Sequence, residues 1–214
     1  GVLYEVDMRL RPSGRSGPLA TSIGSFSDYQ QNEAWTWEHM ALTRARPVAG
    51  PVKLLGVLEE TIRGVLTRKR DPDKLVVDIS DMRQRMAKEF RAQDLFDIKH
   101  ARGGLVDCDF IAQYLQLRHA HDHPGVLDTN TCEALRKLAA HGLLDRAAAE
   151  DLIEATAMWH RVQGLLRLTV GKGNVREAPE GVRRALAMAG RVGDFSALEA
   201  RMAELAEKVM AQFE

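Results

Sequence analysis

The sequence comprises 214 residues, of which 45% are hydrophobic and 28% charged, so it can form one hydrophobic core or two small ones. Thirty basic residues balance 30 acidic ones, and this zero net charge argues against nucleic acid and anionic membranes as partners. No apolar run approaches the ~20 residues that cross a bilayer, and the two cysteines favour a reducing, cytoplasmic location.

In the first twelve residues an apolar side chain recurs at every second position, and most of the positions between are charged, which predicts a β-strand with one face in the core. The opposite face places its side chains about 7 Å apart. On that face the carboxylates of Glu5 and Asp7 are suited to Mg²⁺, and the guanidiniums of Arg9 and Arg11 to phosphate. Alternatively, these charges pair with one another in solvent on a half-buried edge strand. The apolar face is Val2, Tyr4, Val6, Met8 and Leu10. Because the pattern begins at Gly1 without a Met start, we expect a piece of a longer protein.

Helical patterns begin near Ser22 and fill the rest of the chain. Asn32 is a candidate N-cap for a helix to about Arg46, and Pro51 opens a helix that ends at the basic run 68–70. Further helices are predicted over 76–90, from Gly104 to about 120, and near 128–141, 146–169, 179–190 and 194–213. The sequence therefore predicts a mainly α fold, with a strand, loop and helix in residues 1–50 and a helical bundle in residues 51–214.

A double glycine, Gly103 and Gly104, precedes the strongly apolar helix and forms a second candidate site. Glycines there allow close backbone approach and expose free N–H groups at the positive end of the helix. Because Lys99 lies just before the glycines, the sequence predicts an anion site. If Gly104 is the N-cap, Asp107 is the third helical residue, where a carboxylate also stabilises the helix by itself.

Several motifs at these spacings resemble glutamine synthetase adenylyltransferase. The resemblance to the catalytic domain rests on Tyr4–Gly14, Gly17–Leu19, Asn32–His39 and Ala41–Pro47. The resemblance to the helical domain that follows it rests on Phe96–Lys99, Gly103–Asp107 and Phe110–Leu115. The resemblance to this family implies that residues 1–50 are the remnant of a nucleotidyltransferase domain similar to that of DNA polymerase beta.

That family joins two nucleotidyltransferase halves, of which one removes AMP from a tyrosine of glutamine synthetase and the other adds AMP from ATP. This chain resembles the C-terminal, adenylylating half. The resemblance implies that Asp7 binds the catalytic Mg²⁺ and helps to deprotonate the attacking hydroxyl, and that Arg9 and Arg11 are the family's following arginines. A paired Asp-x-Asp precedes the equivalent of Asp7 in the family but not here, so we expect this chain alone to be inactive. Asp109 stands where the family usually has glutamate.

Two other functions stay open at this point. The uridylyltransferase of the PII signal protein has a similar helical domain, although the Trp35–His39 stretch argues against it. A non-catalytic helical docking module would explain residues 120–214 but not the charged face of the strand. The PII protein is an expected partner by resemblance only.

Overall fold

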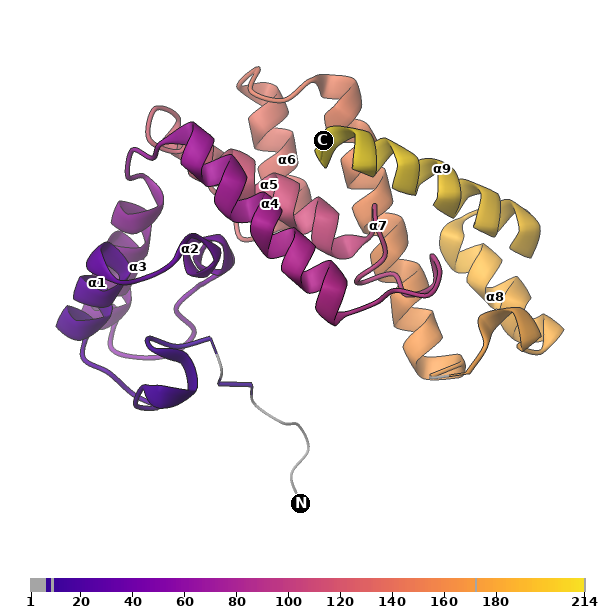
Figure 1. Cartoon of the computed structure of the whole chain (residues 1–214), viewed down its shortest axis with the longest axis horizontal. Coiled ribbons are helices and arrows are strands. Elements are labelled where there is room, and N and C mark those ends of the chain that lie inside the picture. The colour runs from indigo at the N-terminus through magenta and orange to yellow at the C-terminus, as the bar shows by residue number, and fades with distance from the viewer. Residues whose placement is uncertain (1–6, 9, 172, 214) are drawn as a thin grey trace.

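The computed structural model describes residues 7, 8, 10–171 and 173–213, and within them every regular element is a helix. Helices α1–α3 lie on one side of α4, helices α6–α9 lie on the other, and α5 runs behind α4 (Figure 1). None of these helices is long and apolar enough to cross a membrane. The α-helices are α1 (Ile23–Asn32), α2 (Thr36–Leu42), α3 (Val52–Leu66), α4 (Pro72–Glu89), α5 (Leu105–His119), α6 (Thr131–Ala140), α7 (Arg146–Thr169), α8 (Glu180–Gly190) and α9 (Phe195–Phe213).

Polar side chains define several helix ends. A side-chain oxygen accepts a backbone N–H of the first turn at the start of α1, α4, α6 and α7, which satisfies donors that the helix itself leaves unpaired. These caps are Ser22, Asp71, Asn130 and Asp145. After α3, the guanidinium of Arg70 donates to the carbonyls of Val65 and Leu66 at 2.8 and 2.9 Å. The basic run after this helix therefore stabilises its C-terminal end, as a helix dipole favours.

The prediction of one helix from Asn32 to Arg46 is wrong. Asn32 is the last residue of α1, and the next helix begins only at Thr36. The carboxylate of Glu38 accepts the backbone N–H of Trp35 at 2.9 Å, which fixes the start of α2 there. The predicted helices over residues 76–90, 146–169 and 194–213 are confirmed in α4, α7 and α9, within a few residues at each end.

The predicted β-strand falls largely on residues 1–6 and 9, which lie outside the described residues. Asp7, Met8 and Leu10 form no strand, and Met8 and Leu10, predicted to face the core, are 44% and 72% exposed. A strand requires a neighbour for its backbone hydrogen bonds, and no described segment pairs with this stretch. The β remnant stays a prediction for residues 1–6, and so does a domain boundary near residue 50.

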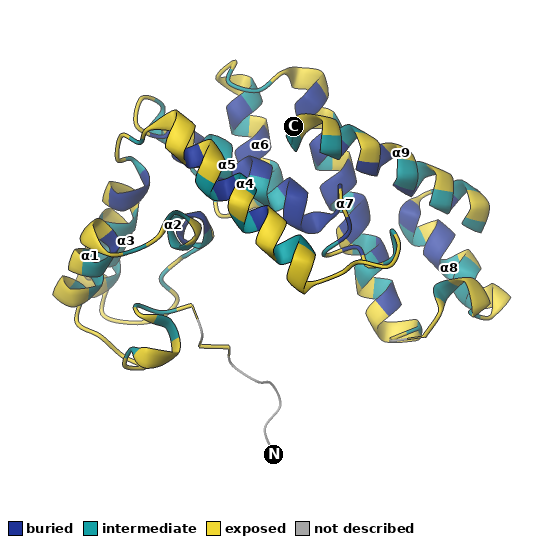
Figure 2. Ribbon diagram, in the orientation of Figure 1, coloured by how far each residue is buried: buried dark blue, intermediate teal, exposed yellow. Residues whose placement is uncertain are grey.

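Among the described residues, the two larger of three clusters of buried apolar side chains hold most of the helices together. The larger cluster lies among α5–α9, and the smaller lies among α2, α3, α4 and the end of α5. Helix α5 belongs to both, because Cys108 and Ile111 are in the larger cluster and Leu117 is in the smaller one. In Figure 2 the buried residues of α5 lie at the centre of the molecule, between the two groups of helices. Helix α5 therefore packs against the N-terminal helices and against the bundle.

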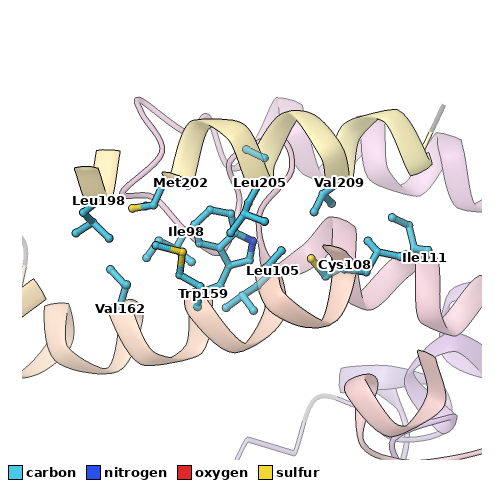
Figure 3. Packing of buried hydrophobic residues seen from close by; sticks show 14 of the residues in the cluster. Ile98, Leu105, Cys108, Ile111, Trp159, Val162, Leu198, Met202, Leu205 and Val209 are labelled. Atoms are coloured by element: carbon cyan, nitrogen blue, oxygen red, sulfur yellow. The ribbon is translucent and has the colours of Figure 1, made fainter. Parts of the chain in front are cut away.

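Trp159 of α7 fixes the start of α5. It is 2% exposed and lies close to Ile98, Leu105 and Leu205 (Figure 3). Its indole N–H donates to the carbonyl of Gly103 at 3.1 Å. Gly103 has a φ of +72°, and a Cβ there would lie 2.2 Å from the carbonyl oxygen of Ala206 in α9. A glycine is thus required because the backbones of two segments meet at this point.

The thiol of Cys108 is expected to resist alkylation in the folded protein. Burial raises the pKa of Cys108 to about 12, so only about 10⁻⁴ of this side chain is thiolate at pH 8. We expect Cys132, which is half-buried, to be labelled faster than Cys108 in the native chain, although burial also raises the pKa of Cys132. Cys132→Ser should then abolish native labelling with iodoacetamide, monitored by mass spectrometry. Rapid native labelling of Cys132→Ser, equal to that in denaturant, would contradict the buried position of Cys108.

Candidate functional site

A cavity of about 1070 Å³ opens between the N-terminal segment, α1–α3 and the sides of α4 and α5. We call it the α1–α5 groove. Its walls are mostly apolar and include Phe26, Met40, Leu58, Met86 and Phe110. Ionisable residues from distant parts of the sequence also line it: Asp7, Arg11, Glu38, Arg44, Arg46 and Lys99. A large apolar cavity with a few polar groups is typical of a ligand-binding site.

The groove brings together three of the site residues that the sequence predicts. Asp7 and Arg11 come from the N-terminal segment and Lys99 from the loop before α5, and all three line the groove. Glu5 and Arg9 lie outside the described residues. Gly103 and Gly104 are not among the residues that line the groove. Of the second candidate site, only Lys99 therefore lines the groove together with Asp7 and Arg11, and the two glycines do not.

Arg11 is occupied by its own loop. Its Nε donates to the carbonyl of Gly17 at 3.2 Å, and its two terminal nitrogens donate to the carbonyls of Met8 and Arg15. A guanidinium has five N–H donors in a fixed plane, so these three bonds hold it against the backbone of Met8, Arg15 and Gly17. In this structure Arg11 stabilises the loop that carries it, and its predicted contact with phosphate would require some of these bonds to open.

The expectation of free N–H groups at the start of α5 is wrong. The N–H of Gly103 donates to the carboxylate of Asp107 at 2.6 Å, and the N–H of Gly104 donates to the carbonyl of Ala101 at 3.0 Å. The next two N–H groups, of Leu105 and Val106, donate to carbonyls of the preceding loop. Close packing explains the glycine at position 104 instead, since a Cβ there would lie 2.3 Å from the carbonyl oxygen of Ile98. The backbone N–H groups that were predicted to bind an anion at Gly103 and Gly104 therefore already have acceptors within the protein.

Asp107 is the third residue of α5 after the N-cap Gly104, as the sequence predicts, but its main partner was not predicted. The carboxylate is fully buried and forms an ion pair with Arg83 of α4, which is 1% exposed. Arg83 also donates to the carbonyls of His100 and Ala101 at 3.1 and 3.3 Å. This buried pair joins α4, the loop before α5 and α5 itself, and it lies outside the residues that line the groove.

Asp109 has a structural role that sequence reasoning missed. Its carboxylate accepts from the guanidinium of Arg44 at 2.8 Å and from the hydroxyl of Thr131 at 2.7 Å. Asp109 therefore ties the segment after α2 to α5 and α6. A shorter acid than the family's usual glutamate is sufficient for these contacts.

Glu38 is likewise occupied, because besides the N–H of Trp35 it accepts the hydroxyl of Tyr29 at 2.8 Å. Within the part of the chain that the structure describes, no group of three or more His, Cys, Asp or Glu side chains is placed to hold a metal ion. Of the acidic residues that line the groove, Asp7 is the one that sequence reasoning assigns to a metal, and it is exposed. A single carboxylate is nevertheless a usual protein contribution to Mg²⁺, which takes further oxygens from phosphate groups.

Two family models match different parts of this chain. Residues 1–60 match the model described as glutamate-ammonia ligase adenylyltransferase. Residues 75–214 match the model described as GlnD PII-uridylyltransferase. The first match includes Asp7 and Arg46, and the second includes Lys99 and both glycines, so the groove is built from residues of both matched regions.

Curated relatives are similar over the whole chain. Proteins named bifunctional glutamine synthetase adenylyltransferase/adenylyl-removing enzyme are 49% identical in Bradyrhizobium diazoefficiens and 48% identical in Rhodopseudomonas palustris, each over 214 residues. A protein of the same name from Xanthobacter autotrophicus is 46% identical over 215 residues. In each case the alignment covers 100% of this chain and 22% of the relative. The chain therefore spans about a fifth of the length of these relatives.

Proposed function

Because the chain belongs to the glutamine synthetase adenylyltransferase family, we propose that it forms part of an enzyme that transfers AMP from ATP to a tyrosine of glutamine synthetase. The observation that carries this proposal is the similarity over all 214 residues to relatives that bear this name. The α1–α5 groove supports it, because it presents the carboxylate of Asp7 beside an apolar surface and several cations. Residues 1–50 are proposed as part of the nucleotidyltransferase domain and residues 51–214 as the helical domain.

Asp7 is the proposed catalytic residue and a proposed ligand of Mg²⁺, with Glu5 as a second candidate ligand. The donor set fits this ion, since Asp7 offers an exposed carboxylate and Mg²⁺ takes one or two such groups together with phosphate oxygens. When bound, Mg²⁺ supplies positive charge to the phosphate oxygens and lowers the pKa of a coordinated hydroxyl. The negative charge of Asp7 would hold the proton of the attacking tyrosine hydroxyl, whose ordinary pKa is about 10.

The isolated chain is proposed to be inactive. Asp7 is one carboxylate, and nucleotidyl transfer in families of this kind requires further acidic residues that the described part of the chain does not gather near it. The arginines are proposed as weaker contributors, since Arg11 is held by its own loop. Activity is therefore expected only in a polypeptide with the full length of the relatives.

Uridylyl transfer to the PII protein is the second candidate function. The specific observation in its favour is the match of residues 75–214 to the PII-uridylyltransferase model. That region contains the helical bundle but not Asp7, so a bundle common to both enzymes explains the match. The PII protein as a regulatory partner stays a prediction.

The test is transfer of label from α-labelled nucleotide in a polypeptide with the full length of the relatives. With Mg²⁺ present, we expect labelled AMP to pass from ATP to glutamine synthetase, and no label to pass from UTP to the PII protein. Labelling of PII from UTP, with none of glutamine synthetase, would replace the proposal by the second candidate. No label on either target, from a folded polypeptide, would favour the docking module.

A further inference from the structure

The cations that line the α1–α5 groove differ in whether the protein already uses them. Arg11 donates to three carbonyls of its own loop, and Arg44 is paired with Asp109. Arg46 and Lys99 are both exposed, and no described residue forms a hydrogen bond or ion pair with either side chain. The groove therefore holds two cations that are available to a ligand.

Both cations belong to segments that are hydrogen-bonded to the first turns of α5. The carbonyl of Lys99 accepts the N–H of Val106 at 3.2 Å, which places Lys99 beside the first turn of that helix. Arg46 lies two residues after Arg44, whose guanidinium donates to the carboxylate of Asp109 at 2.8 Å. Val106 and Asp109 are three residues apart, or about 4.5 Å along the helix axis. Both cations therefore line one groove although they are 53 positions apart in the sequence.

A buried polar group also indicates that the groove is built for a ligand. Gln30 is 6% exposed and lines the groove, and its side-chain carbonyl has no hydrogen-bond donor among the described residues. Most buried acceptors in folded proteins have a donor, so this one is suited to an N–H group of a molecule in the groove. An apolar wall, an unused acceptor and two unused cations match a ligand with an apolar or aromatic part and a phosphate chain.

We propose that Arg46 and Lys99 together bind the phosphate chain of the nucleotide in the α1–α5 groove. This inference rests on the proposed function and extends it to two residues, of which Arg46 has no role assigned from the sequence. The guanidinium of Arg46 provides paired donors to phosphate oxygens, and the ammonium of Lys99 provides a compact charge. Both act on the ligand directly and require no change in the packing of the helices.

The test is calorimetric titration of the 214-residue chain with inorganic tripolyphosphate in a buffer with a chelator. The chelator removes divalent metal, so binding does not depend on the role proposed for Asp7. We expect Arg46→Gln and Lys99→Gln each to weaken binding by about tenfold or more, because each removes a charged contact. Lys99→Arg should retain most of the affinity.

Lys53→Gln is the matched control. Lys53 is exposed on α3, has no described partner and does not line the groove. Its substitution should change affinity by less than about twofold. An equal loss in Lys53→Gln would indicate a diffuse field rather than a site, and would overturn the proposal. So would wild-type affinity in both groove variants, or no binding by the native chain up to about 10 mM tripolyphosphate.

The outcome is separable from that of the proposed function. If the full-length polypeptide transfers AMP but neither groove variant alters binding of tripolyphosphate, the function stands and the assignment of Arg46 and Lys99 fails. If both variants lose binding but no AMP is transferred, the groove is an anion site and the proposed function fails.

Discussion

Asp7→Asn should lower the rate of AMP transfer to glutamine synthetase by about 10²- to 10⁴-fold in a polypeptide with the full length of the relatives. Asparagine preserves the size of the side chain but removes the negative charge. That charge is the property on which both metal binding and acceptance of a proton depend. The measurement is initial-rate incorporation of α-labelled AMP at saturating Mg²⁺ and ATP.

Asp28→Asn provides the matched control for this prediction. Asp28 is an exposed carboxylate in α1 that does not line the groove, and no described residue is hydrogen-bonded to its side chain. Its substitution should leave the rate within about twofold of the wild-type value. A rate for Asp7→Asn within the same range would show that the carboxylate takes no part in the chemistry. It would then favour a docking role for this chain.

Asp107→Asn should lower the free energy of unfolding of the 214-residue chain by about 3–5 kcal/mol. The asparagine can still accept the N–H of Gly103, but the guanidinium of Arg83 would be buried without a counter-charge. Removal of one partner from a buried pair is costly because the remaining charge cannot regain its hydration. The measurement is urea denaturation followed by circular dichroism, with an unchanged m-value as the check that the unfolded state is the same.

Two comparisons separate the effect of burial from that of the substitution itself. Asp109→Asn makes the same change two residues further along α5, where the partner Arg44 has a 47% exposed side chain, so we expect a loss of about 1 kcal/mol. The double variant Arg83→Met, Asp107→Asn removes both buried charges and should be more stable than the sum of the single losses implies. Equal losses in Asp107→Asn and Asp109→Asn would refute the importance of the buried pair.

Most of the helices were predictable because their ends carry short-range signals. Pro51, and Gly104 before an apolar run, mark the starts of α3 and α5 from a few neighbouring residues of the chain. Asn32 was misread because a residue that can cap a helix also suits a helix end. Helical spacing alone does not decide burial, since Val76 of α4 and Phe90, which follows α4, are 44% and 42% exposed.

The candidate site was only partly predictable. Asp7 and Lys99 could be proposed from local pattern and resemblance, but that they line one groove follows from how α2, α4 and α5 pack. Arg83 offered a weak signal, since it continues the spacing of four from Leu75 and Ile79 onto a buried face. The use of Arg11 for its own loop depends on a turn conformation that the sequence does not specify, and so does the occupation of the N–H groups at Gly103 and Gly104.

Helix α5 contributes side chains to the two larger hydrophobic clusters, and this makes it a thermodynamic link between the two ends of the molecule. A rigid helix whose opposite ends are packed in different cores cannot tilt or loosen at one end without a free-energy cost at the other. Packing within the bundle therefore also restrains the first turn of α5. Residues such as Leu205 and Trp159 do not line the groove, yet we expect them, by fixing α5, to reduce the entropy lost when a ligand enters it.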